Sequence, residues 1–192
     1  MLPEPIAATI QVTTAMEQLG IPYFVGGSLA STIYGLIRST QDADLITEML
    51  PENVRAFVQA LSKDFYLDEE MIANAISDHT SFNIIHRISM FKVDVFVPVI
   101  QPFVKEQFDR AQKQILTTSP QAEAMIATAE DTLLAKLDWY RLGGEASDRQ
   151  WRDVLGILKI QAGKLDLDYI RKWAKELGIS DLLERILTQS AT

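Results

Sequence analysis

The chain has 192 residues, 47% of them hydrophobic, so it can bury a full core, and disorder is not expected. Its net charge of −8 argues against a broad surface that tracks the phosphates of long nucleic acid, and no extended non-specific DNA binding is expected. Because the chain contains no cysteine, disulfides and thiolate metal sites are excluded.

The apolar runs of the sequence are too short to cross a membrane. Those at 33–37 and 93–100 fall far short of the roughly 20 residues that a helical span needs. The first ten residues carry acid and proline where a signal peptide would carry basic residues. We therefore expect a cytoplasmic protein with no membrane partner.

Hydrophobic periodicity predicts mixed helices and strands up to about residue 127. Apolar residues at helical spacing indicate a first helix that ends at Gly20, and the short apolar run Ile21–Val25 is typical of a buried strand. Two β-rich runs around Ile88-Ser89 suggest an antiparallel hairpin. In chain order we expect helix 5–19, strand 21–25, helix 28–34, strand 42–46, helices 51–63 and 68–76, strands 81–87 and 90–97, helix 102–111 and an edge strand 115–118.

From Thr128 onward the pattern is helical. Thr128 and Ser147 are candidate N-caps, and Gly143-Gly144 ends the first helix. Further helices are expected to about 161, over 166–177 and over 180–188. We therefore expect an α/β (α+β) protein with a mixed sheet flanked by helices in residues 1–127, followed by a helical region, 128–192. No long flexible linker separates the two, which suggests that they pack together.

Three aspartates are the candidate catalytic residues. Asp42 and Asp44 alternate on a predicted strand, so both side chains point to one face, about 7 Å apart along the chain. Such a pair repels unless a cation lies between the carboxylates, and hard oxygen ligands favour Mg²⁺ or Mn²⁺. Asp94 is central in an otherwise apolar strand, where a carboxylate is costly unless it is paired or binds metal. Three such carboxylates suit a two-metal phosphoryl-transfer site.

A glycine-rich turn precedes these aspartates. Gly26-Gly27-Ser28 lies at a strand-to-helix turn, where backbone N–H groups can hold phosphate oxygens. Each signal has a plainer alternative: an ordinary turn, a surface Asp pair, and a salt bridge from Asp94 to Lys92, Arg87 or Arg38. The order and spacing of the three signals together favour the site.

The segment VGGSLASTIYGLIRSTQDADL resembles the nucleotidyltransferase superfamily, and within it the AbiEii-like, abortive-infection toxin type. That family pairs a Gly-Gly segment with Tyr-Gly, Arg, Thr and Asp-x-Asp at similar intervals. The resemblance implies a nucleotidyltransferase-like fold, metal ligation by Asp42, Asp44 and Asp94, and a nucleoside triphosphate as substrate. The nucleotide-binding residues that it implies in this stretch are Gly26, Gly27, Ser28, Arg38 and Thr40.

The resemblance continues more loosely into the helical region. The family carries a lysine on one helix and a basic-Asp pair on the next, which Lys136 and Arg152-Asp153 match by position. By resemblance Lys136 would contact the triphosphate; the alternative is an exposed helix residue paired with neighbouring acids. Gly156 stands where the family has a second acid.

Two functions are therefore expected. In the first, the protein moves a nucleoside monophosphate from an NTP to a hydroxyl of RNA or protein, with Mg²⁺ or Mn²⁺ as cofactor. In the second, it is a catalytically degenerate relative that binds a nucleotide or a partner as a regulator of the toxin-antitoxin type. A compact helical RNase is not expected, because no arginine stands four to six residues before either His79 or His86.

Overall fold

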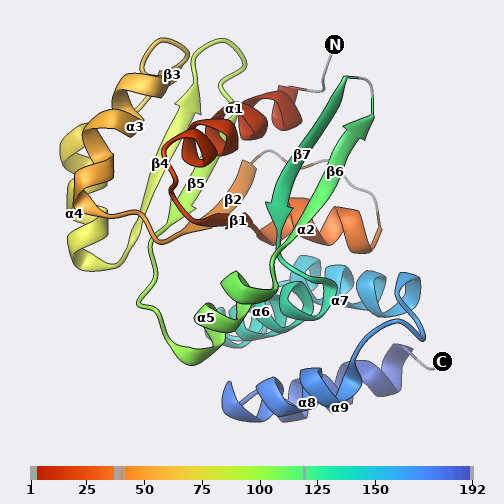
Figure 1. Ribbon diagram of the computed structural model, residues 1–192. Coiled ribbons are helices and arrows are strands. Elements are labelled where there is room, and N and C mark those ends of the chain that lie inside the picture. Colours follow the sequence, from red (N-terminus) through yellow and green to blue (C-terminus); the bar gives the residue numbers. More distant parts are fainter. Residues whose placement is uncertain (1–3, 37–39, 41, 119, 191–192) are drawn as a thin grey trace. The chain divides into compact units, whose positions relative to one another are not determined.

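The fold was analysed in a computed structural model, which describes residues 4–36, 40, 42–118 and 120–190. In this part of the chain seven strands form one sheet in the order β3-β4-β5-β2-β1-β7-β6 (Figure 1). The pairs β2–β5 and β1–β7 are parallel and the other pairs are antiparallel. The strands are β1 (Tyr23–Val25), β2 (Asp42–Thr47), β3 (Phe65–Tyr66), β4 (Ser81–His86), β5 (Lys92–Phe96), β6 (Gln112–Thr118) and β7 (Gln121–Ile126).

The chain divides into two compact units that interleave along the sequence. The sheet unit comprises Met1–Gly26 and Thr40–Ile126, and the helical unit comprises Gly27–Ser39 and Ala127–Thr192. The helices of the sheet unit are α1 (Glu4–Gln18), the 3-10 turn η1 (Pro51–Asn53), α3 (Val54–Leu61), α4 (Glu69–Asp78) and α5 (Pro102–Arg110). Those of the helical unit are α2 (Gly27–Tyr34), α6 (Ala129–Leu142), α7 (Asp148–Ile160), α8 (Leu167–Glu176) and α9 (Ser180–Ser190).

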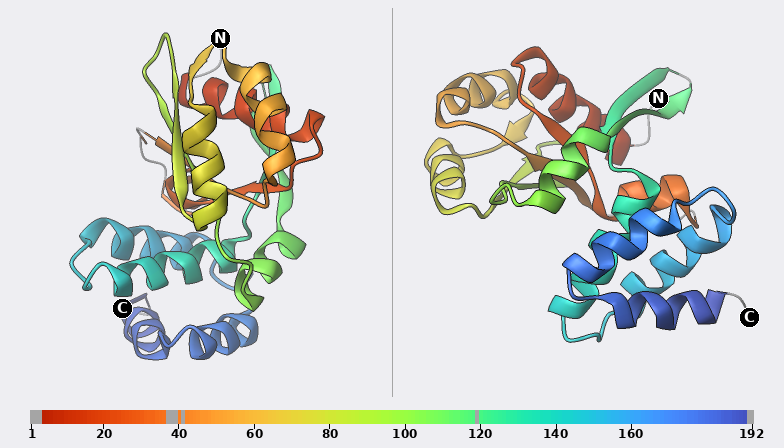
Figure 2. Two further views of the ribbon diagram at one scale, coloured as in Figure 1. Left: turned by 90° about the vertical axis from the view of Figure 1, so that its left-hand side faces the viewer. Right: turned by 60° about the horizontal axis from the view of Figure 1, so that its bottom comes forward.

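Alternation along the central strands separates the two faces of the sheet. In β2 every second residue from Ala43 is buried, and in β5 the same holds from Val93, whereas the residues between them are partly exposed. In the sheet unit, α1 packs against α3 and against β2, and α4 packs against α3 and β4 (Figure 2). The aspartates therefore lie on the less buried face of the strands, away from the apolar core.

The helical unit is built around the contacts of α2 with α6 and α7. Leu29, Ala30 and Ser31 of α2 are buried there. The expected caps are confirmed: the Thr128 side chain accepts a hydrogen bond from the Asp131 N–H, and that of Ser147 from the Gln150 N–H. No helix in the described ranges is long and apolar enough to cross a membrane.

Most predicted elements are confirmed to within two or three residues, but two strands were missed. β7 and the short β3 lie in stretches for which we expected no strand. The edge strand expected over 115–118 is the end of β6, which pairs with β7 from Gln112 onward. The grouping of 27–39 with the C-terminal helices also differs from the expected division at residue 127, which treated the sequence as two consecutive parts.

Candidate active site

The register of β2 and β5 brings the predicted carboxylates together. In this parallel pair Asp44 is the partner of Asp94, and Asp42 is the partner of Lys92. Partnered residues on neighbouring strands point to the same side of a sheet, so these four charged side chains share one side. We call Asp42, Asp44, Lys92 and Asp94 the carboxylate face.

Gly26 follows β1 at the edge of this face. Its N–H donates a hydrogen bond to the carbonyl oxygen of Asp44 at 2.9 Å, which ties the glycine turn to the aspartate strand. A Cβ added at Gly26 would come within 2.9 Å of the Ile46 side chain, so a larger residue would have to displace it. Gly27 begins α2 with a φ of +54°, a backbone conformation that favours glycine. Both glycines thus have a steric reason to be there.

Thr40 positions the first aspartate. Its hydroxyl lies 2.8 Å from the carbonyl oxygen of Asp42 and 3.1 Å from Asp42 Oδ1, and it donates to these acceptors. Among the predicted nucleotide-binding residues, Thr40 thus contacts the Asp42 carboxylate directly. Arg38, another of them, lies outside the described residues.

Lys92 is the cation of the carboxylate face. Its Nζ lies 2.6 Å from Asp94 Oδ2, with 42% of the lysine side chain and 14% of the aspartate side chain exposed. The hydrogen bond to Asp94 raises the pKa of Lys92, burial opposes the rise, and the charges of Asp94, Asp42 and Asp44 add to it. The salt bridge from Asp94 to Lys92, which the sequence left as an alternative, is therefore present.

The donor set of this face suits a hard divalent cation. Carboxylate oxygens are the ligands that Mg²⁺ and Mn²⁺ prefer, and the register puts Asp44 and Asp94 on neighbouring strands. Within the described ranges, however, no three Asp, Glu or His side chains lie close enough to hold a metal ion together. The residues suit the metal by type, but their side chains do not form a three-ligand site in this arrangement, and Asp94 is already paired with Lys92.

Asn83 is a candidate site residue that the sequence did not reveal. It is the β4 partner of Asp94 in an antiparallel pair, and its side chain is exposed on the same side of the sheet. The alternation of polar Ser81 and Asn83 with apolar Phe82 and Ile84 was the available signal. Alternation identifies an exposed face, but only the long-range register shows that the face is shared with Asp94.

In the helical unit, Lys136 forms a buried ion pair. Its Nζ lies 2.9 Å from Asp153 Oδ2, with 5% and 9% of the two side chains exposed. Nζ also donates a hydrogen bond to Gln150 Oε1 at 3.0 Å, and the Ser31 hydroxyl lies 3.5 Å from Asp153 Oδ2. The alternative of an exposed lysine is therefore wrong, and its acidic partner comes from the next helix along the chain.

Gly156, which replaces the acid expected after Asp153, has a packing role. A Cβ there would lie 3.2 Å from the backbone N and from Cγ of Leu36. A Cβ on Gly35 would in turn lie 2.9 Å from the Ser31 carbonyl oxygen and 3.1 Å from the Ile157 N. The two glycines let the segment that follows α2 approach α7 closely, so an acid at position 156 would require Leu36 to move.

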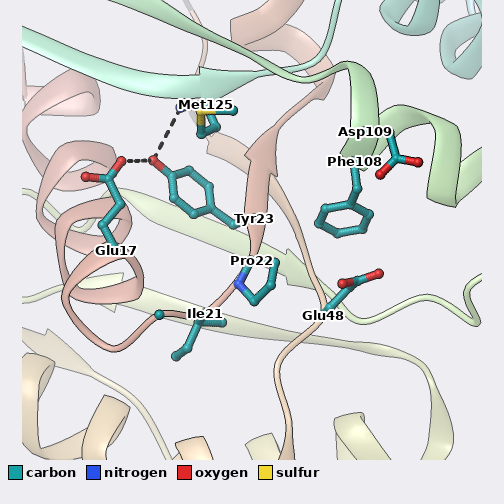
Figure 3. A pocket seen from close by; sticks show the side chains of 9 residues that line it. Glu17, Ile21, Pro22, Tyr23, Glu48, Phe108, Asp109 and Met125 are labelled. Carbon is teal, nitrogen blue, oxygen red and sulfur yellow. Dashed lines mark hydrogen bonds between the residues drawn. The ribbon is translucent and has the colours of Figure 1, made fainter.

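A separate cavity of about 470 Å³ lies in the sheet unit at the other ends of β1 and β2 (Figure 3). The Tyr23 hydroxyl donates a hydrogen bond to Glu17 Oε1 at 2.7 Å and accepts one from the Met125 N–H at 3.3 Å. Burial and the hydrogen bond to Glu17 raise the pKa of Tyr23. The cavity contains none of the predicted site residues; it is lined by Glu17, Gly20, Ile21, Pro22, Tyr23, Glu48, Phe108, Asp109 and Met125.

Both histidines have structural surroundings. His79 ends α4 with a φ of +51° as its C-cap. Nδ1 of His86 lies 2.8 Å from the Ser89 hydroxyl in the β4–β5 turn, and its ring lies 5.2 Å from that of Phe65.

The fold is similar to solved structures of nucleotidyltransferase-like proteins. An antigenic nucleotidyltransferase-like protein from Paracoccidioides brasiliensis matches with a TM-score of 0.55 and 15% identity, over 96% of this chain and 93% of its own. The antibiotic-resistance factor ANT(2'')-Ia matches with a TM-score of 0.51 and 8% identity, over 97% of both chains. The lincosamide antibiotic adenylyltransferase LnuA, in a lincomycin-bound structure, matches with a TM-score of 0.51 and 12% identity, over 83% of this chain and 98% of its own.

At the level of sequence, no family model matches the chain, and a comparison with curated proteins gives no significant match. At these identities the structural likeness concerns the fold. The chain therefore has the nucleotidyltransferase-like fold that the sequence predicted.

Proposed function

We propose that the protein is a Mg²⁺-dependent nucleotidyltransferase that moves a nucleoside monophosphate from an NTP to a hydroxyl of RNA or protein, as AbiEii-like proteins are expected to do. The observation that carries this proposal is the register of Asp44 with Asp94, with Asp42 two residues before Asp44 on the same face. Their position on a nucleotidyltransferase-like sheet supports it.

In the proposed reaction an acceptor oxygen attacks the α-phosphorus, its bond to phosphorus forms, and the bond to pyrophosphate breaks. Asp42 and Asp44 would hold the metal, and Thr40 keeps the Asp42 carboxylate in place. Asp94 orients the acceptor hydroxyl and takes its proton, or ligates the metal. Bound Mg²⁺ would neutralise charge on the phosphates and the leaving pyrophosphate.

The predicted nucleotide ligands divide between backbone and side-chain groups. The N–H groups at Gly27 and Ser28, at the start of α2, are proposed to bind phosphate oxygens. Arg38 and Lys136 stay predicted phosphate ligands. The Lys136 ammonium already contacts Asp153 and Gln150, so a phosphate oxygen would share it with these two side chains.

Calorimetric titration of ATP, GTP, CTP and UTP with Mg²⁺ tests the proposal. We expect metal-dependent binding of at least one NTP to the wild type and its loss in Asp42→Ala/Asp44→Ala. Since one structural neighbour is an adenylyltransferase, ATP is the first choice. Pyrophosphate release with labelled ATP and candidate acceptors then tests for transfer, and Asp94→Ala should abolish it. Full activity of Asp94→Ala would rule out its role.

The second candidate is a non-catalytic protein that binds a nucleotide or a partner. The ion pair between Lys92 and Asp94 favours it, because it occupies the carboxylate proposed to act on the acceptor. Tight NTP binding without pyrophosphate release, under conditions that offer RNA and protein acceptors, would support this regulator.

A further inference from the structure

The side of the sheet that carries Asp94 continues onto strands β4 and β3. Asn83 of β4 is exposed, whereas its neighbour Phe82 is buried, with its ring 6.5 Å from that of Phe57 in α3. Since successive side chains of a strand point to opposite sides, α3 covers the side away from Asn83. In β3, Tyr66 is 51% exposed.

The register of the strands aligns Tyr66 with the carboxylate face. Tyr66 is the partner of Ile85 in β4, which is the partner of Lys92 in β5. Partnered residues point to the same side, so these three form a row across three strands. Asp94 lies in the next row, two residues along β5. With strands about 4.8 Å apart and a rise of about 3.4 Å per residue, Tyr66 lies roughly 12 Å from Asp94 along the sheet.

Arg87 adds a cation next to the Tyr66 ring. Its Cζ lies 4.0 Å from the ring centroid, and Nη2 donates a hydrogen bond to the Ser62 carbonyl oxygen at 3.2 Å. A guanidinium has further N–H donors beyond this one. Aromatic rings and guanidinium planes are surfaces on which single-stranded RNA bases stack, and arginine also binds phosphate. The pair therefore has the chemistry to bind RNA.

This surface suits single-stranded RNA better than the other acceptors. β3 has only two residues, so it is a poor template for pairing with a peptide strand. The chain carries a net charge of −8, so a duplex held mainly through its phosphates is not favoured. Stacking on an aromatic ring depends little on charge and requires bases that are not paired.

We propose that the acceptor is a single-stranded RNA, which lies across this side of the sheet and brings a hydroxyl to Asp94. One base stacks against the Tyr66–Arg87 pair, Arg87 binds a phosphate, and the Asn83 amide contacts the reacting nucleotide. The RNA hydroxyl oxygen bonds to the α-phosphorus, pyrophosphate leaves, and Asp94 takes the hydroxyl proton. This inference rests on the proposed function and names its acceptor.

Binding of a short fluorescein-labelled single-stranded RNA of mixed sequence, followed by fluorescence anisotropy, tests the stacking. Tyr66→Leu removes the ring and should weaken binding about tenfold. Tyr66→Phe keeps the ring and should bind as tightly as the wild type. Trp139→Ala, which removes a ring of similar exposure (55%) in the helical unit, is the control and should leave binding unchanged.

The salt dependence of the same binding tests the phosphate contact of Arg87. Arg87→Gln should lower the slope of log Kd against log salt concentration by about 0.7, the value for one phosphate of a single strand. Arg55→Gln changes an exposed arginine of α3 and should leave the slope unchanged. Tyr66→Leu should weaken binding with little change in slope, because stacking releases few counterions. If Tyr66→Leu does not fold, the Arg87→Gln slope decides the question.

Transfer from labelled NTP to the RNA separates this inference from the proposed function. Tyr66→Leu and Asn83→Ala should raise the KM for RNA and leave NTP binding unchanged. If the Tyr66→Leu and Arg87→Gln variants bind RNA as the wild type does, or if the wild type labels protein but not RNA, the inference is overturned and the nucleotidyltransferase proposal stands. If the wild type binds no NTP, the proposed function itself fails, and with it the acceptor role of the RNA.

Discussion

Tyr23 and Glu17 show how one buried hydroxyl can contribute to stability. The Tyr23 side chain is almost fully buried, and its hydroxyl joins α1 to the backbone of β7 through Glu17 and the Met125 N–H. Tyr23→Phe should therefore lower the free energy of unfolding by about 1 to 2 kcal/mol at pH 8. Chemical denaturation measures the difference.

The same substitution should have a pH-dependent effect. Because the pKa of Tyr23 is raised in the folded state, the hydroxyl stays protonated there above pH 10, whereas the unfolded chain ionises. The stabilisation is thus complete below pH 10 and is lost as pH rises above it, by about 1.4 kcal/mol at pH 11. Denaturation of both proteins at pH 8 and pH 11 tests this. The same difference in unfolding free energy between wild type and Tyr23→Phe at both pH values would contradict this. Tyr66→Phe, which changes a half-exposed tyrosine, is the control.

The buried pair of Lys136 and Asp153 allows a sharper prediction. Lys136→Met removes the cation that lies 2.9 Å from the buried Asp153 carboxylate and should cost about 3 to 5 kcal/mol of unfolding free energy. Adding Asp153→Leu removes the carboxylate as well and should recover most of that loss. Lys159→Met, at an exposed position of α7, is the matched control. A double variant as unstable as Lys136→Met would mean that the charge is not the cause.

At the scale of elements, the approach of α2 to α7 limits what position 156 can hold. Alanine in a helix interior is usually about 0.5 to 1 kcal/mol better than glycine. Gly156→Ala should nevertheless destabilise the protein by about 1 to 3 kcal/mol, because its Cβ meets Leu36 at 3.2 Å. The unfolding temperature shows whether the substitution stabilises or destabilises the protein. In a Leu36→Ala background the loss of stability should be smaller, since one of the two contacts at 3.2 Å is with the Leu36 side chain. A Gly156→Ala variant that is more stable than the wild type would refute the prediction.

Local pattern was sufficient for elements whose signal lies within a few residues. The alternation in 42–46 places Asp42 and Asp44 on one side of β2, and Thr128 marks the start of α6, as the structure confirms. β7 was missed because its sequence, QAEAMI, has few β-branched or aromatic residues. β7 is stabilised by pairing with β1 on one side and with β6 on the other. β1 is distant in sequence and β6 is the preceding strand, so neither pairing is encoded in the residues of β7 alone.

The candidate site follows the same division between local and long-range information. Spacing alone identified the three aspartates as candidates, but the register of β2 with β5 decides that Asp44 lies beside Asp94 and Lys92 beside Asp42. Similarly, the resemblance drew attention to Lys136, whereas its burial against Asp153 depends on how α6 and α7 pack. The residue types were predictable, and Lys92 was one of three cations considered for Asp94. Which of the three pairs with Asp94, and that Asp153 pairs with Lys136, depend on the fold.

At the scale of the whole molecule, the helical unit depends on a segment from early in the chain. Since α2 packs on α6 and α7 through buried Leu29 and Ala30, a fragment of residues 127–192 should lack part of its core. We expect its circular dichroism to show reduced helix and a broad thermal transition. A fragment in which residues 27–36 are joined to it by a flexible linker should unfold cooperatively. Cooperative unfolding of the 127–192 fragment alone would contradict this.

The interleaving of the two units also has a consequence during synthesis on the ribosome. α2 is made before β2, whereas α6 and α7, its packing partners, follow only after β7. At about 5 to 20 residues per second, the apolar side of α2 waits for several seconds without the surface that will cover it. Over that interval the nascent chain presents Leu29 and Ala30 to solvent or to a chaperone, while strands β2 to β7 of the sheet are still being made.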